Sequence, residues 1–439
     1  MARRARKEAV VLGRSKGSRP QQQELDPRLS RSIGSAEGRR HLQLLLAARR
    51  RTATTAVTEL VRALPRDTFL ETAVAAFRDR TDIPLELPLG AAMAMINAHV
   101  LRSGASLDLR GQRVSPALWT VVLAPSGGGK TFAIDQLMAA TGADLERFPE
   151  PGSAAQFVDA LQRHNRSLWI RDEFGQFLAN MQNQKHCAEL RDYMLRLYDG
   201  GRIERHTLKH SVTVDEPALT LFAAQVSDTW HDCRPADALL DGFAQRFNFI
   251  LARSEREVIV PIYDLSPWYA RLRETWRWLT VVPLAPTYAV GDEAIGAFEA
   301  VFHAFHGGLG GAMPRSFFRR TLFAGLRYAL VYHVLRGKTQ PCLDAADVAW
   351  AAQMIWRHLC DSARMLEPAG MSDLSDRLER VRRVVTKARE RGAVVSPRDV
   401  QQATKFSAAE ARALLELALE GDPAATPAER ERAAGVGRR

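Results

Sequence analysis

Ala124-Pro-Ser-Gly-Gly-Gly-Lys-Thr131 is the most informative octapeptide in this sequence of 439 residues. It fits the pattern G-x-x-x-x-G-K-[ST], except that Ala124 replaces the first glycine. Glycines in such a loop let backbone N–H groups turn inward around phosphates, and the start of the following helix favours anions. We therefore expect ATP to be bound by Pro125, Ser126, Gly127, Gly128, Gly129, Lys130 and Thr131. In this pattern Lys130 reaches the β- and γ-phosphates, and the Thr131 hydroxyl coordinates Mg²⁺.

The residues on either side of the loop predict a strand before it and a helix after it. Residues 117–123 form a continuous apolar run rich in β-formers, which is typical of a strand buried on both faces. Residues 131–141 place their large apolar side chains on one helical face, and Gly142 suits the C-terminal cap. This context favours a P-loop over the alternative, a flexible glycine turn that happens to precede Lys-Thr.

A second strand ends in two acids, 42 residues after Lys130. It reads Ser167-Leu-Trp-Ile-Arg-Asp172-Glu173. We expect Asp172 to hold Mg²⁺ and Glu173 to act as the general base on the attacking water. The spacing leaves room for a helix, a short strand and a second helix, so the two strands can be neighbours. The alternative is a surface Asp-Glu pair at a strand end, with Arg171 at the strand edge or paired with a carboxylate.

Two further apolar runs, residues 217–224 and 247–251, predict two more strands. Gln225 follows the first of them and is placed like a polar sensor of the γ-phosphate. Arg246 precedes the second, where an arginine of a ring-forming ATPase points into the neighbouring subunit's nucleotide. Among Arg319, Arg320 and Arg327, we rank Arg320 first as a second nucleotide sensor. For these residues the alternatives are a surface arginine and solvated helix faces.

Strands that alternate with helical segments predict an α/β fold with a parallel sheet flanked by helices. The core would be a P-loop NTPase of the RecA/AAA+ kind. We expect the chain to comprise a disordered basic arm (1–35), an N-terminal helical region (36–105), the P-loop NTPase core (106–260), a helical region completing the ATPase module (261–368), a winged-helix-like module (369–421) and a disordered tail (422–439).

The net charge of +11 is concentrated at the start of the chain. Residues 1–51 hold 14 Lys and Arg against 4 Asp and Glu, a net of +10, so the other 388 residues carry only +1. Such an arm either contacts nucleic acid, here DNA, or is a solubilising tail. We find no apolar run of about 20 residues, which argues against a membrane span.

The four cysteines are not spaced as zinc ligands, so we interpret them as buried thiols in a reducing cytoplasm. The Arg-rich, acid-poor start leaves a mitochondrial transit peptide as the alternative location.

The ordered set of motifs resembles a family of P-loop proteins of formally uncharacterised function, found on plasmids, prophages and integrated elements. Members often lie beside, or are fused to, a primase–polymerase domain. The resemblance covers residues 85–365, and its matching segments are Leu118–Thr131, Trp169-Ile-Arg-Asp-Glu-Phe-Gly175, Leu195-Arg-Leu-Tyr-Asp-Gly200, Glu216–Leu221 and Gly242-Phe-Ala-Gln-Arg-Phe247.

The resemblance implies a replicative helicase-like ATPase. In it, Lys130 and Thr131 would bind nucleotide and Mg²⁺, Asp172 would be the magnesium-side acid and Glu173 the catalytic acid. Arg246 would act in trans, which implies a homo-oligomer, and we expect a hexamer. We find no primase motif, so a separate primase or replication protein would be a partner.

The C-terminal module departs from a DNA-reading winged helix. Its third predicted helix carries Glu410, Glu416 and Glu420 against Arg412, which is a poor face for phosphates. No wing strands follow Gly421. We therefore consider a protein contact as the alternative role of this module.

Three functions remain open from the sequence. The first is an ATP-driven helicase or translocase that replicates a mobile element. The second is a regulatory ATPase or loader on DNA, and the third is a nucleotide-dependent defence or signalling scaffold without DNA. DNA-stimulated hydrolysis separates the third from the other two, and strand separation distinguishes the first from the second.

Overall fold

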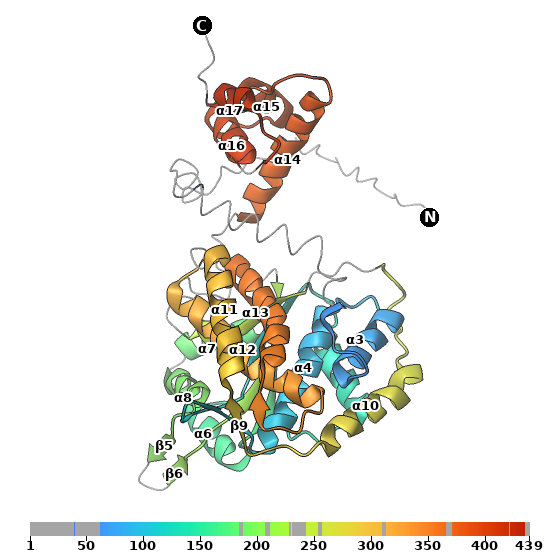
Figure 1. Ribbon diagram of the computed structural model, residues 1–439, viewed down its shortest axis with the longest axis vertical. Helices are drawn as coiled ribbons and strands as arrows, with labels where there is room; N and C mark the ends of the chain where they lie inside the picture. The colour runs from blue at the N-terminus through green and yellow to red at the C-terminus, as the bar shows by residue number, and fades with distance from the viewer. Residues whose placement is uncertain are drawn as a thin grey trace, which may run out of the picture. The chain divides into compact units, whose positions relative to one another are not determined.

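The computed structural model of this chain shows an α/β protein (Figure 1). It describes Arg39, Trp230 and residues 62–183, 188–206, 211–227, 243–252, 257–309, 313–365, 371–420 and 422–434. The whole of the predicted basic arm (1–35), and residues 36–38 and 40–61 of the predicted N-terminal helical region, lie outside these residues. The chain divides into two compact units, one of which is Arg39–Glu367; the helices from Met371 onward belong to the other.

The core of the larger unit is a four-stranded parallel sheet in the order β4-β7-β3-β8. Its strands are β3 (Trp119–Ala124), β4 (Ser167–Arg171), β7 (Leu219–Val226) and β8 (Asn248–Leu251). All four coincide with the predicted apolar runs, so the parallel sheet flanked by helices is confirmed. The spacing allowed β3 and β4 to be neighbours, but β7 pairs with both and separates them.

Helix α4 (Glu86–Arg102) contacts all four strands of this sheet. Its small residues allow close packing: a Cβ on Gly90 would lie 3.3–3.4 Å from side-chain carbons of β3, β7 and β8. Asn97 is fully buried, and it donates to Pro116 O and accepts from Leu118 N and Thr220 Oγ1. These three hydrogen bonds satisfy the amide and fix α4 to the start of β3 and to β7.

The remaining helices of this unit surround the sheet (Figure 1). They are α3 (Phe69–Arg80), α5 (Lys130–Thr141), α6 (Ala154–Arg163), α7 (Phe174–Asn183), α8 (Ala188–Tyr198), α10 (Tyr269–Val281), α11 (Asp292–Leu309), α12 (Arg315–Leu335) and α13 (Ala345–Met365). Ser153 caps α6 through Gln156 N. Gly142 ends α5 with a left-handed φ of 61°, as predicted. Helix α11 continues through Gly307 and Gly308 to Leu309.

A second, smaller sheet was not predicted. Its order is β10-β9-β1-β2, formed by β1 (Ser106–Leu109), β2 (Gln112–Val114), β9 (Thr287–Val290) and β10 (Cys342–Leu343). Strands β1 and β2 form a hairpin, with Arg110 and Gly111 at positive φ in its turn. A separate hairpin pairs β5 (Ile203–His206) with β6 (Ser211–Val214).

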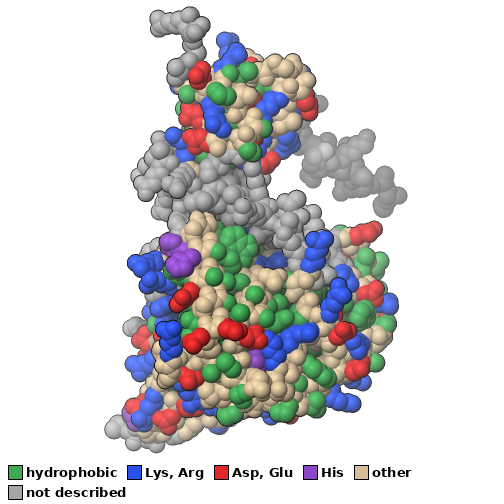
Figure 2. Space-filling model, viewed as in Figure 1, with side chains coloured by type: hydrophobic (Ala, Val, Ile, Leu, Met, Phe, Trp, Pro, Cys, Tyr) green, Lys and Arg blue, Asp and Glu red, His purple; other side chains and the backbone are tan. Residues whose placement is uncertain are grey.

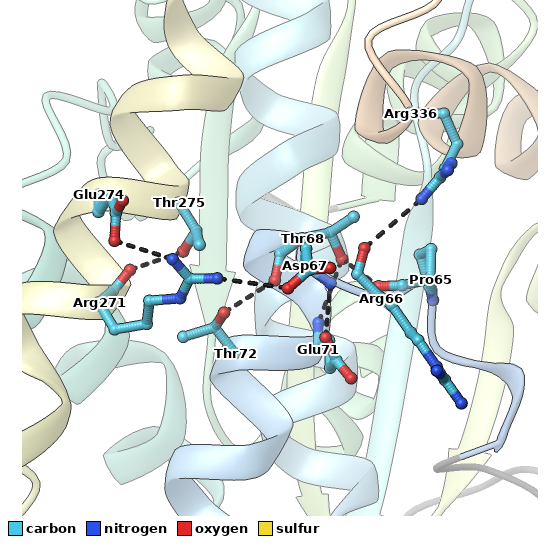
Figure 3. A network of polar contacts seen from close by, with 10 residues as sticks. All are labelled: Pro65, Arg66, Asp67, Thr68, Glu71, Thr72, Arg271, Glu274, Thr275 and Arg336. Atoms are coloured by element: carbon cyan, nitrogen blue, oxygen red, sulfur yellow. Dashed lines mark hydrogen bonds and ion pairs between the residues drawn. The ribbon is translucent and has the colours of Figure 1, made fainter.

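The start of α3 is attached to two later helices through a polar network (Figure 3). Thr68 caps α3, and the Asp67 backbone N–H donates to Glu71 Oε2 at 2.6 Å. Arg271 of α10 lies 3.5 Å from Asp67 and 2.9 Å from Glu274, while Arg336, just after α12, donates to Arg66 O. Side chains more than 200 residues away in sequence therefore position this helix.

The second unit contains α14 (Met371–Arg389), α15 (Pro397–Thr404), α16 (Ala408–Glu420) and α17 (Pro427–Ala433). Ser396 caps α15, with Pro397 at the first position of the helix. The prediction of a disordered tail from 422 is wrong for residues 422–434, because Thr426 and Glu429 form a capping box that starts α17. Glu429 also pairs with Arg389 at 2.7 and 2.9 Å.

Within its described residues 371–420 and 422–434, this unit has no strand, so the structure supplies no wing there. Glu410, one of the acids on the third predicted helix, is an ion-pair partner of Arg377 in α14. Over the whole described part of the chain, no helix is long and apolar enough to cross a membrane.

Candidate functional site

The glycine-rich loop 124–131 connects the end of β3 to the start of α5. Gly127 and Gly129 have φ values of 74° and 76°, which glycine adopts without the strain of a Cβ. Gly128 N donates to Pro125 O at 3.1 Å, which closes the turn. No side chain caps α5 and no acid lies in its first turn, so the backbone N–H groups at this helix end face no competing carboxylate.

The two acids follow β4 on the same sheet. Asp172 and Glu173 are both exposed, and Asp172 Oδ1 accepts a hydrogen bond from Glu173 N at 2.9 Å. Glu173 has φ 49°, in the left-handed region that costs a residue with a Cβ about 1–2 kcal/mol. Its carbonyl accepts from Gln176 N and Phe177 N, so this conformation also begins α7.

The next two residues explain how that turn is held in place. Phe174 is fully buried and contacts Phe247 with ring centroids 5.0 Å apart. Gly175 N donates to Gln225 Oε1 at 2.9 Å, and Gln225 is only 5% exposed at the end of β7. Gln225 thus lies at the predicted edge of the sheet, and its amide oxygen positions the start of α7.

The strand register places the carboxyl ends of β3, β4 and β7 at the same edge of the sheet. Leu123 of β3 pairs with Gln225, while Arg171 of β4 pairs with Ala223 two residues earlier on β7. Because strands are about 4.8 Å apart, the insertion of β7 separates the ends of β3 and β4 by about 10 Å. The inserted strand therefore leaves space between the glycine-rich loop and Glu173. If β3 paired directly with β4, the distance between their ends would be about half as large.

Arg171, just before the acids, is half-buried and forms an ion pair with Glu150. Its guanidinium also lies over the Phe177 ring, 4.8 Å from the centroid. The sequence left open whether Arg171 lies at a strand edge or pairs with a carboxylate, and the structure shows the pair.

Residues from outside the sheet form a wall beside the loop. Ile83 lies against Gly129, where an added Cβ would come within 2.6 Å of Ile83 Cδ1. Phe132, in the first turn of α5, contacts Tyr263 with ring centroids 5.6 Å apart. Tyr263 donates its hydroxyl to Asp82, and this hydrogen bond raises the pKa of Tyr263 to about 12. Asp82 and Ile83 thus tie the segment around Tyr263 to the side of the loop.

Arg246 lies at the opposite edge of the sheet. It ends the 3-10 helix η2 (Ala244–Arg246), immediately before β8, and its side chain is 8% exposed. Its Nη2 donates to Asp199 Oδ2 at 2.6 Å, and its guanidinium lies over the Tyr198 ring. Arg246 is therefore not the exposed surface arginine that the sequence left as the alternative. Its side chain also does not project outward, as contact with a neighbouring subunit's nucleotide would require.

Arg320, which the sequence analysis ranked first as a second nucleotide sensor, lies near Arg246. Its pKa is lowered by burial and then by the nearby charge of Arg246, so Arg320 lies in the same cluster around Tyr198 and Asp199. Since β3 has six residues, the two edges of the sheet are about 20 Å apart, which is beyond the reach of an arginine side chain. Helix α12 contacts η2, and this packing is what holds Arg320 there.

Arg327, the third arginine considered on α12, also has a structural position. It is buried, donates to Ala117 O at 2.7 Å and lies 4.3 Å from the centroid of Tyr198. Sequence reasoning missed Tyr198 and Asp199 as the centre of this cluster. The available signal was the segment Leu195–Gly200, which belongs to the motif set but had no assigned role.

The described residues hold no group of three or more His, Cys, Asp or Glu that could bind a metal by itself. Mg²⁺ commonly needs only one or two protein oxygen ligands when phosphates supply others. The Thr131 hydroxyl and the Asp172 carboxylate fit that requirement chemically. A comparison of the sequence with protein-family models and with curated proteins found no match.

Proposed function

We propose that this protein is a P-loop NTPase that binds ATP with Mg²⁺ at the loop 124–131 and hydrolyses it. The observation that carries the proposal is the convergence of three elements at the carboxyl edge of one parallel sheet. They are the glycine-rich loop after β3, the acids Asp172 and Glu173 after β4, and Gln225 at the end of β7. Ligands of open α/β sheets bind at this edge.

The loop residues fit a triphosphate. The uncapped N-terminus of α5 offers backbone N–H groups and the positive end of the helix dipole. Lys130 is the first residue of that helix, and its Nζ lies 3.5 Å from Pro125 O, over the loop. Thr131 and Asp172 would hold Mg²⁺, which supplies charge neutralisation at the phosphates.

Glu173 would take the proton of the water that attacks the γ-phosphate. Its carboxylate is exposed, and the backbone around it is fixed by Asp172, the buried Phe174 ring and the Gly175–Gln225 hydrogen bond. A strained non-glycine residue that its surroundings hold in place is a common feature of functional sites. Gln225 would act by holding the start of α7 beside the γ-phosphate.

We further propose that hydrolysis serves work on DNA, as a helicase or translocase for a mobile element. Support comes from the sequence resemblance and from the +10 charge of residues 1–51. A DNA loader and a scaffold without DNA remain the alternatives, and a separate primase or replication protein would be the partner of either DNA-directed activity.

The proposed homo-oligomer has one structural support. Val258, Val260 and Ile262 are 87%, 70% and 85% exposed in a segment that Asp82 ties beside the loop. Exposed apolar side chains this close together in the chain favour a protein interface, and we assign it to a second copy of this chain. A trans role for Arg246 would require it to leave Asp199. Val258→Asp with Ile262→Asp should lower the mass measured by light scattering; an unchanged mass excludes this interface.

The test of function is the steady-state ATPase rate with and without single-stranded DNA. Wild type and Lys387→Ala, which removes an exposed lysine of α14, should hydrolyse ATP equally, whereas Lys130→Ala should lose at least about 100-fold. A rate that DNA raises several-fold supports the DNA-directed proposal, and strand-separation assays then distinguish motor from loader. A Lys130-dependent rate that DNA does not change favours the scaffold, and a rate independent of Lys130 refutes the proposed site.

A further inference from the structure

A basic pocket of about 560 Å³ lies in the unit Arg39–Glu367, away from the glycine-rich loop. It is formed by the carboxyl-terminal ends of α4 and α5 together with α10. Helix α5 has 12 residues and is therefore about 18 Å long, with Lys130 at its other end. The volume is typical of a small-molecule site. Its chemically active lining residues are His99, Arg102, Asp144, Arg273, Trp276 and Arg277.

One face of α10 provides most of the donors. Arg273, Trp276, Arg277 and Thr280 follow the spacing i, i+3, i+4, i+7, which places them along a single helical stripe. Trp276 is 6% exposed, and its ring contacts Phe69 at 4.9 Å and His99 at 6.0 Å. The indole thus forms a fixed floor, and the two arginines, one turn apart, are exposed beside it.

The side chains of the pocket carry an excess of positive charge. Arg102, Arg273 and Arg277 oppose only Asp144, which gives a net charge of +2. Arg102 donates to Asp144 O and Arg273 Nε to Ala140 O, so each retains further N–H donors. Arg277 forms no hydrogen bond or ion pair with its side chain among the residues that the structure describes. This guanidinium is thus fully available to a ligand.

His99 also lines the pocket. Its Nε2 is buried and has no hydrogen-bond partner within the described part of the chain. Burial, and then the charge of Arg102, lower the pKa of His99, so the imidazole is neutral at physiological pH and can offer one N–H.

We propose that this pocket binds a phosphate-bearing ligand, with Arg273 and Arg277 as the principal phosphate contacts. Arginine guanidinium groups match phosphate oxygens in charge and geometry, and a net charge of +2 compensates a phosphate dianion. At the end of α5, Arg273 donates to Ala140 O and the backbone N–H of Gly142 donates to Met138 O, so these two carbonyls already have partners. The phosphate belongs either to a free small molecule or to a nucleic-acid strand.

The test measures binding of sodium pyrophosphate and of an oligothymidylate by titration calorimetry. All proteins carry Lys130→Ala, so that the glycine-rich loop contributes little and no hydrolysis is required. Adding Arg273→Ala and Arg277→Ala should weaken binding of at least one probe by tenfold or more. Arg277→Ala alone, which removes no described contact, should give a smaller loss in the same direction. The matched control is Arg271→Ala on the same helix, whose side chain is directed to Asp67 and Glu274 (Figure 3).

The pattern of loss identifies the source of the phosphate. Loss for pyrophosphate alone assigns a small phosphorylated ligand, and loss for the oligothymidylate assigns strand phosphates. The proposal is overturned if neither probe binds, or if the double variant and Arg271→Ala bind equally. This outcome is independent of the proposed ATPase, because hydrolysis is absent from every measurement.

Discussion

Replacing Glu173 with glycine should abolish ATP hydrolysis and at the same time stabilise the larger unit. Glu173 has φ 49°, so its Cβ costs about 1–2 kcal/mol that glycine does not incur. Glycine also has more conformational freedom in the unfolded chain, which offsets roughly 0.5–1 kcal/mol. The side chain is exposed, so its loss removes little packing. We therefore expect a net gain of about 0.5–1 kcal/mol in the free energy of unfolding.

Urea unfolding followed by tryptophan fluorescence measures this change. All eight tryptophans lie between Trp119 and Trp356, so the signal reports only on the unit Arg39–Glu367. At a slope of about 3 kcal/mol per molar urea, the midpoint should rise by about 0.2–0.3 M. ATPase activity of Glu173→Gly should fall by about 100-fold or more, which is the usual effect of losing a general base.

Two variants separate the strain from the chemistry. Glu173→Gln keeps the Cβ, so it should lose hydrolysis without a change in the urea midpoint. Arg110→Gly removes a similar strain, φ 53°, from an exposed hairpin turn, so it should raise the midpoint and leave hydrolysis intact. A lower midpoint for Glu173→Gly, or an active Glu173→Gln, would refute the reasoning.

Three further predictions concern other parts of the molecule. Asn97→Leu should lower the unfolding free energy by about 3 kcal/mol, because it removes three buried hydrogen bonds, and urea unfolding checks this. The Arg389 hydrogen bond lowers the pKa of Glu429 from 4.5 to about 2. Its contribution is therefore complete above pH 4.5 and is lost as the pH falls toward 2. Hydrogen exchange of α17 in the full chain, corrected for intrinsic rates, should follow this window, and Glu429→Gln should raise exchange at neutral pH. Deleting residues 1–35 should weaken DNA binding and reduce its salt slope; an unchanged slope excludes the arm as the contact.

The central sheet could be predicted from the sequence because each strand is a continuous apolar run bounded by turns. The smaller sheet could not, since β2 is short and polar and β1 pairs with β9 about 180 residues away. Helix α17 was missed although Thr426-Pro-Ala-Glu429 is a readable capping box. The Pro-, Ala- and Arg-rich composition of residues 422–439 favoured a disordered tail and obscured this capping box.

In the candidate site too, features set by local sequence could be predicted, whereas features set by long-range pairing could not. Local patterns placed the loop, Asp172, Glu173 and Gln225 at one edge, because parallel strands share the direction of their carboxyl ends. The insertion of β7 between β3 and β4 is a property of topology, which spacing alone leaves undetermined. The sequence did not indicate that Arg246 is buried, or that Asp199, 47 residues earlier in the chain, is its ion-pair partner.

Equilibrium binding of ATP in the presence of Mg²⁺, compared between wild type and Lys130→Ala, tests the central claim most directly. A charge-assisted contact to phosphate contributes about 3 kcal/mol, so Lys130→Ala should bind about 100-fold more weakly, with Lys387→Ala unchanged as the control. Equal affinity of the wild type and Lys130→Ala would contradict the claim that the loop 124–131 is the nucleotide site.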